Sequence, residues 1–310
     1  MTKFAFFFPG QGSQSVGMMK GFESLNVIRD TFVEASDVLS QDFWRMAIEP
    51  NELLNQTIHT QPLMLTAGVA VWRAWQAEVG AQPAIMAGHS LGEYTALVAA
   101  DTLAFQDALP LVRYRAKVMQ EAVAEGVGAM AAILGLADEN VRAVCSQAAQ
   151  GKVLEAVNFN SPGQVVIAGH KEAVERGMQA ALEKGAKRAL PLPVSVPSHC
   201  ALMKPAAEAL REYLMDVAVA APKVPVIHNA DVAAYDTPEK IKDALVRQLY
   251  SPVRWVETVT HVHSQDAKMS AECGPGKVLA GLVKRINPDL TCATLTSVEA
   301  LHEAGTQFAQ

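Results

Sequence analysis

The chain has 310 residues, of which 50% are hydrophobic and 19% are charged, so it can bury a sizeable core and need not be disordered. Its formal net charge of -6 gives no reason to expect a nucleic acid or an anionic membrane as a partner. Residues 4–8 are apolar but too short for a signal-peptide core, and no other run approaches a membrane span, so we expect a cytoplasmic protein.

Strands and helices alternate along the first part of the chain, which is the pattern of an α/β protein. A buried strand is expected at residues 4–8, ended by Pro9-Gly10. A helix follows from about residue 62 to 78, with apolar residues at helical spacing and Gly80 as its stop. The short apolar run at 84–87 then leads through a glycine-flanked serine into a helix at 91–100.

The middle of the chain predicts a separate small unit. It reads as a strand at 130–134, a helix at 138–150 with Asp138 as N-cap, a hairpin of 153–157 with 165–168, a helix at 172–184 and a strand at 188–194. This β-α-β-β-α-β order is the ferredoxin-like unit, which can sit as an insert. We place it at residues 125–195, inside a discontinuous large domain of residues 1–124 and 196–310 that also holds strands near 224–227 and 268–272.

Residues 87–94 read AGHSLGEY and place Ser90 between Gly88 and Gly92. A tight turn from strand to helix brings backbones close together, which requires glycine on both sides and projects the serine hydroxyl from the top of the sheet. The following helix offers its positive dipole end, and the Leu91 N–H points where an oxyanion would form. The pattern therefore predicts a nucleophile, although a glycine-rich turn with an ordinary serine is the simpler alternative.

A serine nucleophile needs a base. His89 adjoins Ser90, but neighbouring side chains at a sharp turn usually diverge, whereas His199 lies where the chain returns from the expected insert. A lone histidine in that position is more often a capping or surface residue. His261 and His263 have no third ligand nearby, and the four cysteines lie far apart without a C-x-x-C pair. We therefore expect no metal site, no disulfide framework and buried free thiols.

Several motifs, in order over nearly the whole chain, resemble the malonyl-CoA:acyl carrier protein transacylases, with the bacterial stand-alone enzymes of fatty acid synthesis as the closest type. Two positions depart from the family pattern: Ala116 stands where glycine is usual, and Cys273 stands where valine is frequent. Both changes are small or apolar and bear on local packing rather than chemistry. The motifs are Phe8–Gln14, Thr60-Gln61-Pro62, Gly88–Tyr94, Arg115 with Met119-Gln120, Asn158–Gln164, Pro197-Ser198-His199 and Gly274-Pro275-Gly276.

The resemblance implies a large α/β-hydrolase-like domain with a parallel sheet, a small ferredoxin-like insert, and acyl transfer in two steps. Ser90 would attack the thioester of malonyl-CoA with His199 as general base, and the phosphopantetheine thiol of acyl carrier protein would then attack the malonyl-serine ester. The backbone N–H groups of Leu91 and Gln11 would hold the oxyanion. No cofactor is implied, and we expect a monomer.

The same resemblance implies the substrate-binding residues. Arg115 would bind the malonyl carboxylate through two parallel hydrogen bonds, which the planar guanidinium allows and lysine does not. Gln61 would assist, and Met119 and Asn160 would line the pocket. Without the resemblance, Arg115 is a charge on a helix surface between two other basic residues.

What orients His199 is a separate question. In a hydrolase triad of this fold an acid should lie between Ser90 and His199 in the chain, yet no candidate is well placed. The resemblance points instead to the backbone carbonyl of Gln248. The candidates are Asp101 and Asp107, near the helix after Ser90, and Asp138, Glu139 and Glu155, in the expected insert.

Two alternatives stay open. A serine thioesterase would share Ser90 and His199 but have no use for Arg115, and a non-catalytic carrier-binding module would leave Ser90, His199 and Gln11 unexplained. Because acyl carrier proteins are acidic, a chain of this net charge needs a local basic surface, for which Lys187-Arg188 and Lys284-Arg285 are candidates.

Overall fold

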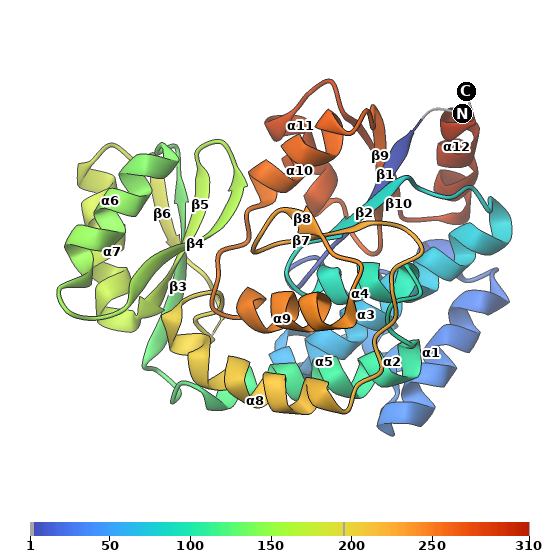
Figure 1. Ribbon diagram of the computed structural model, residues 1–310, viewed down its shortest axis with the longest axis horizontal. Helices are drawn as coiled ribbons and strands as arrows, with labels where there is room; N and C mark the ends of the chain where they lie inside the picture. Colours follow the sequence, from blue (N-terminus) through green and yellow to red (C-terminus); the bar gives the residue numbers. More distant parts are fainter. Residues whose placement is uncertain (1–2, 195, 310) are drawn as a thin grey trace.

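Five consecutive apolar residues form β1 (Phe4–Phe8), which lies inside a six-stranded sheet of order β10-β9-β1-β2-β7-β8. The computed structural model describes residues 3–194 and 196–309 (Figure 1). All pairings are parallel except that of the short β8, which is antiparallel to β7. The other strands are β2 (Ile85–Gly88), β7 (Val226–His228), β8 (Ala233–Ala234), β9 (Met269–Cys273) and β10 (Thr291–Leu295).

Helices cover both faces of this sheet, which is why β1 is apolar at every position. On one face Phe6 packs against Trp75 of α3 (Thr57–Glu78), with ring centroids 5.0 Å apart. On the other face Phe7 packs against Trp255 of α10 (Trp255–Ser264) at 5.3 Å. Near the two ends of the chain, the Phe4 ring stacks on Phe308 at 4.4 Å. The result is a three-layer domain with a parallel sheet at its centre.

The remaining large-domain helices surround this sheet, and the first two of them were not expected from the sequence. They are α1 (Asn26–Leu39), α2 (Phe43–Ile48), α4 (Gly92–Ala99), α5 (Phe105–Glu121), α8 (Lys204–Met215), α9 (Pro238–Gln248), α11 (Val278–Ile286) and α12 (Val298–Phe308), with short 3₁₀ turns at Lys20–Phe22, Leu53–Asn55 and Ala201–Met203.

The start of α3 was placed too late in the sequence. The helix expected from about residue 62 begins earlier, at Thr57, and Pro62 lies inside it. The helix is almost entirely buried from Thr60 to Trp75, so tertiary packing offsets the hydrogen bond that proline cannot donate. As a consequence, Gln61 is carried on a rigid helix rather than on a loop.

The second sheet confirms the expected small α/β unit. Its four strands are antiparallel, in the order β4-β5-β3-β6, and its own core includes Ile133, Val165 and Ile167. The last strand is shorter than the sequence predicts: it ends at Pro191 rather than at residue 194, because Pro191 and Pro193 have no N–H for a ladder. The elements are β3 (Gly128–Leu134), α6 (Asp138–Ala149), β4 (Leu154–Ser161), β5 (Gln164–His170), α7 (Lys171–Glu183) and β6 (Arg188–Pro191).

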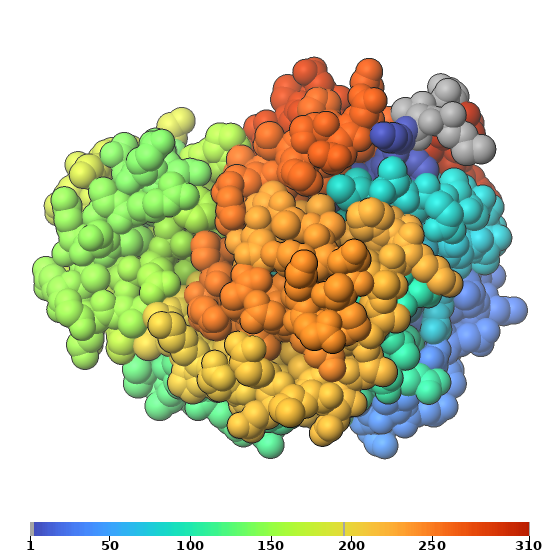
Figure 2. Space-filling model, in the orientation of Figure 1, coloured from blue at the N-terminus to red at the C-terminus, as the bar shows by residue number. Residues whose placement is uncertain are grey.

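The small sheet lies at one end of the molecule, in green and yellow in Figures 1 and 2. Backbone hydrogen bonds join β4 to the large domain: Phe159 donates to the Val253 carbonyl at 3.0 Å, and Val253 donates to the Val157 carbonyl at 2.8 Å. The Arg285 guanidinium also donates to Gln164 at 2.7 Å. The boundary proposed at residue 195 lies outside the described residues, as do residues 1, 2 and 310. Within residues 3–194 and 196–309, no helix is long and apolar enough to cross a membrane.

Candidate active site

Ser90 lies at the carboxyl end of β2, between the strand and α4, with its backbone in the left-handed region at φ 51°. The turn is so tight that a Cβ on Gly88 would lie 1.9 Å from the Gly92 carbonyl group, and a Cβ on Gly92 would lie 2.0 Å from the Phe8 carbonyl oxygen. Only glycine fits at both positions. The turn therefore has the geometry of a nucleophile elbow, in which a serine has a backbone conformation that residues other than glycine rarely adopt.

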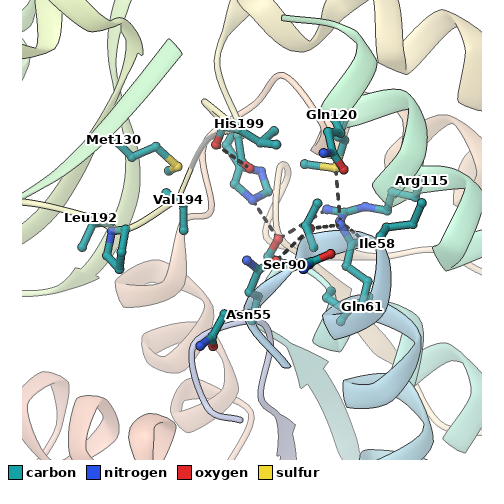
Figure 3. Close-up of a pocket in the computed structure, with 18 of the residues that line it drawn as sticks. Asn55, Ile58, Gln61, Ser90, Arg115, Gln120, Met130, Leu192, Val194 and His199 are labelled. Carbon is teal, nitrogen blue, oxygen red and sulfur yellow. Dashed lines mark hydrogen bonds between the residues drawn. The ribbon is translucent and has the colours of Figure 1, made fainter. Parts of the chain in front are cut away.

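His199 is buried and directed at this serine (Figure 3). Its Nε2 lies 2.8 Å from Ser90 Oγ, and its Nδ1 lies 2.8 Å from the backbone carbonyl oxygen of Gln248. A carbonyl only accepts, so Nδ1 carries the proton and Nε2 is free to accept from the serine hydroxyl. Within residues 3–194 and 196–309, no carboxylate is hydrogen bonded to His199. Ser90 and His199 therefore form a hydrogen-bonded pair, with a backbone carbonyl as the second partner of the histidine.

Burial, followed by the nearby Arg115 guanidinium, lowers the pKa of His199 to about 3. Hydrogen bonding to the Gln248 carbonyl opposes this shift. The imidazole is therefore neutral at neutral pH, which is the state that can accept a proton from Ser90.

Arg115, on α5, is 1% exposed and its guanidinium points into the same space. Its Nη1 donates to Gln61 Oε1 at 2.7 Å, its Nη2 donates to Gln248 Oε1 at 2.9 Å, and Nη2 also lies 3.4 Å from Ser90 Oγ. Burial lowers the pKa of Arg115, since the charge is removed from water. Nη1 keeps one N–H beyond its bond to Gln61, and the second N–H of Nη2 is directed at Ser90 Oγ, so an anion next to Ser90 can accept from both terminal nitrogens.

Gln61 and Met119 complete the wall around Arg115. Gln61, which is 2% exposed, bonds to Arg115 through its oxygen, while its Nε2 lies 3.0 Å from Thr57 Oγ1 and 3.9 Å from the Met119 sulfur. These contacts fix the direction of the Gln61 amide.

The backbone N–H groups of Gln11 and Leu91 are both available at the pocket. Gln11 follows β1 and Leu91 follows Ser90, and both residues line the cavity. In the described part of the chain, neither N–H donates a hydrogen bond to another protein group. Free donors beside a nucleophile are what an oxyanion requires.

Asn160 lies behind the wall of the pocket. Its Oδ1 accepts from His89 Nε2 at 2.8 Å, and the His89 ring packs on Trp255 at 5.4 Å. It is Asn158, on the same strand, that lines the cavity. The pairing of β4 with β5 is irregular between Phe159 and Ser161, which breaks the simple alternation of side chains.

The cavity has a volume of about 360 Å³ and lies between the two sheets. On the side of the large domain it is polar, with Ser90, Arg115 and Gln61 pointing inward (Figure 3). The opposite wall comes from residues 125–195 and is mostly apolar, through Met130, Leu192 and Val194, with Asn158 as a polar member. The buried Arg115 guanidinium in its lining suits a small organic group with an anionic end.

Three further residues support the elbow and were not expected from the sequence. The Ser90 N–H donates to Asn229 Oδ1 at 2.7 Å, and Asn229 Nδ2 donates to the Gly88 carbonyl at 2.6 Å. The buried Glu93 accepts from the Asn229 N–H at 2.9 Å and from His228 Nδ1 at 2.7 Å. The sequence did contain a signal for Asn229, because this residue directly follows β7. The carboxyl ends of parallel strands lie at one edge of a sheet, and β7 is the neighbour of β2, which precedes Ser90.

No group of three or more histidine, cysteine, aspartate or glutamate side chains is arranged to hold a metal ion in residues 3–194 and 196–309. The four cysteines are free, and three of them are buried.

Comparison with known proteins gives consistent matches over nearly the whole length of the chain. The acyl transferase domain family matches residues 5–307. The malonyl CoA-acyl carrier protein transacylase of Salmonella typhimurium is 55% identical over 309 residues, covering 99% of this chain and 100% of its own length. The enzyme of the same name from Bacillus subtilis is 43% identical, covering 98% of this chain and 96% of its own length.

Solved structures agree with these matches. An acyl-carrier-protein S-malonyltransferase from Burkholderia pseudomallei superposes with a TM-score of 0.97 at 59% identity, covering 98% of this chain and 100% of that chain. A malonyl-transacylase in complex with its type II PKS acyl-carrier protein superposes with a TM-score of 0.97 at 52% identity, covering 99% of this chain and 100% of that chain.

Proposed function

The chain belongs to the acyl transferase family, and to the malonyl CoA-acyl carrier protein transacylases within it, and we propose that it transfers malonyl from malonyl-CoA to acyl carrier protein through a malonyl ester on Ser90. The observation that carries this proposal is the meeting of three groups. Ser90 Oγ lies 2.8 Å from the His199 base and 3.4 Å from the Arg115 guanidinium. A nucleophile beside an anion site fits an acyl group that carries its own carboxylate.

In the first half-reaction, Ser90 Oγ attacks the thioester carbonyl carbon while its proton passes to His199 Nε2. The oxyanion is held by the N–H groups of Gln11 and Leu91. Collapse of the tetrahedral intermediate breaks the carbon–sulfur bond, and His199 gives the proton to the departing CoA thiolate. The products are malonyl-Ser90 and CoA.

The second half-reaction repeats these steps with the phosphopantetheine thiol of acyl carrier protein. His199 takes the thiol proton, the sulfur attacks the ester carbonyl, and Ser90 leaves with that proton. Because Gln248 presents a neutral carbonyl to His199 Nδ1, the imidazolium is stabilised less than beside a carboxylate. This suits a reversible transfer between activated thioesters.

Arg115 binds the malonyl carboxylate in this proposal. One methylene separates that carboxylate from the reacting carbonyl, so the anion site has to lie close to Ser90 Oγ, as the 3.4 Å contact allows. Gln61, which also contacts Met119, holds the Arg115 guanidinium in this direction. Asn160 accepts a hydrogen bond from His89 and so supports the wall of the pocket.

The partner is an acidic carrier protein, which needs exposed basic residues near the pocket. Lys187 and Arg188, at the start of β6, and Lys284 and Arg285, at the end of α11, are exposed. We propose these two pairs as the docking surface. They lie on the small and large domains, and the Arg285–Gln164 bond links the two domains.

The proposal also covers the oligomeric state of the protein, its need for a cofactor, its cellular location and its domain limits. Nucleophile, base and anion site all come from one chain, so neither a cofactor nor a second copy is needed, and we propose a monomer without a cofactor. Four free cysteines suit the reducing cytoplasm. We also retain residues 125–195 as the small domain, with residues 1–124 and 196–310 as the large one.

The test is acyl transfer in the presence and absence of an acceptor. The protein incubated with malonyl-CoA should retain a malonyl group until a carrier-protein thiol is added, and that thiol should then carry it. Rapid release of free malonate without any acceptor would instead establish the serine thioesterase that shares this fold and dyad.

A further inference from the structure

Three buried side chains form a line that begins at a negative charge and ends at a positive one. The Gln248 Nε2 donates to Glu93 Oε2 at 2.9 Å, and Arg115 Nη2 donates to Gln248 Oε1 at 2.9 Å. Glu93 and Gln248 are 0% exposed and Arg115 is 1% exposed. The carboxylate and the guanidinium are therefore separated by a single amide.

Opposite charges buried this close together ordinarily pair, because a bidentate arginine–carboxylate contact offsets much of the desolvation cost. Here they do not: in the described residues Arg115 forms no salt bridge. Its short hydrogen bonds go to the amide oxygens of Gln61 and Gln248. Neutral acceptors fix the plane of a guanidinium without cancelling its charge.

We propose that the side chain of Gln248 is a spacer that keeps Glu93 from pairing with Arg115, so that the guanidinium remains available to the carboxylate of the acyl substrate. Gln248 is thus a positioning residue for substrate selection as well as the residue whose backbone orients His199. This inference rests on the proposed function, since it concerns how the same site selects a carboxylate-bearing acyl group.

Glu93 is prevented from moving toward Arg115 by its other partners. His228 Nδ1 bonds to one of its oxygens at 2.7 Å, and the Asn229 N–H bonds to the other at 2.9 Å. The carboxylate thus contributes a compensating negative charge near Arg115 without occupying its N–H groups. Gln248 is held too, because its Nε2 also lies 3.0 Å from the Ser90 carbonyl oxygen.

The sharpest variant exchanges the two residues, as Glu93→Gln combined with Gln248→Glu. The exchange keeps the same atoms and the same total charge but places the carboxylate directly on Arg115. A single Gln248→Glu change is less informative, because two adjacent buried carboxylates would share a proton and one would remain neutral.

The readout is the ratio of kcat/KM for acylation of Ser90 by malonyl-CoA to that by acetyl-CoA, which reports on the acyl carboxylate and not on folding. We expect the exchange to lower this ratio at least about tenfold, mainly through the malonyl reaction, because the substrate then has to displace an internal carboxylate. Gln41→Glu is the matched control, since it also replaces an amide oxygen that accepts from an arginine of α5, in this case Arg113, and Gln41 does not line this cavity. It should leave the ratio within about threefold of wild type.

A second variant approaches Arg115 from its other side and protects the test against misfolding of the exchange. Gln61→Glu replaces the other amide oxygen on the guanidinium and should lower the ratio in the same way. A wild-type ratio in a folded exchange variant or in Gln61→Glu, or an equal fall in Gln41→Glu, would overturn the spacer role of Gln248. Failure of the wild-type protein to form malonyl-Ser90 would overturn the proposed function instead.

Discussion

Ser90 and His199 meet at 2.8 Å, and both residues have left-handed backbones, with φ values of 51° and 66°. Such conformations are uncommon for residues other than glycine and persist only where the surroundings hold them. The Ser90 backbone is held by Asn229 and Gln248. The His199 backbone is held by its N–H bond to the Leu249 carbonyl at 3.0 Å. Both strained conformations therefore occur where the two reacting atoms, Ser90 Oγ and His199 Nε2, have to meet.

Arg115→Ala should remove the preference for malonyl. The substrate carboxylate would lose two charge-assisted hydrogen bonds in a partly desolvated pocket, at a cost of about 2 to 5 kcal/mol in transition-state binding, whereas acetyl never made that contact. The measurement is kcat/KM for each acyl-CoA. Arg113→Ala is the control, since Arg113 lies on the same helix but bonds to the Leu39 carbonyl and Gln41. Equal losses for malonyl and acetyl would make Arg115 structural.

The pH profile of acylation should lack the fall expected of an ordinary histidine. A model histidine has a pKa of about 6.5, but burial and Arg115 lower that of His199 to about 3. A lowered pKa means that the neutral base persists as the pH falls, so kcat/KM should stay level from about pH 8 to about pH 5. An inflection near pH 6.5 that disappears on changing His199 would show that the imidazole titrates normally.

Gly92→Ala should destabilise the fold as well as the activity. The added methyl would lie 2.0 Å from the Phe8 carbonyl oxygen, so β1 and the elbow would have to separate, at a cost of about 1 to 3 kcal/mol or more. Thermal unfolding measures this. Gly281→Ala, on α11 with nothing within 4 Å of the new methyl, should be neutral or stabilising by up to about 1 kcal/mol. Similar melting temperatures for both variants would contradict the close approach at Gly92.

Charge reversal on the proposed docking surface should weaken transfer to the carrier protein only. Lys187→Glu combined with Lys284→Glu should raise KM for acyl carrier protein about threefold to tenfold and leave transfer to free pantetheine unchanged. Lys3→Glu is the control, since Lys3 lies at the amino end of β1, whereas Ser90 follows the carboxyl end of the parallel strand β2. A change with free pantetheine would indicate damage to the pocket rather than to docking.

The sequence was sufficient for the fold class and the elbow, because both depend on local signals. Alternating strands and helices predict the parallel sheet, and the spacing of Gly88, Ser90 and Gly92 is imposed by a turn within a few residues. The early start of α3 could not be predicted, because burial from all sides outweighs the signal of Pro62. Propensity gives no account of packing that comes from distant segments.

The supporting residues were missed for the same reason. Glu93 stands three residues after Ser90 in the quoted motif, yet its role depends on Asn229 and Gln248, which the fold brings from far along the chain. Asn160 was expected at the pocket, but irregular strand pairing places it against His89. The Gln248 carbonyl was expected from the family resemblance alone, since a backbone acceptor has no sequence signature.

The most direct test of the account is intact-protein and peptide mass spectrometry after incubation with malonyl-CoA. We predict one malonyl group on wild-type protein, mapped to Ser90, that is lost when carrier-protein thiol is added and recovered on that thiol. Ser90→Ala should acquire none, because the covalent route depends on the Ser90 hydroxyl. A malonyl group on Ser90→Ala, or transfer to the carrier protein without any acyl-Ser90, would contradict the account.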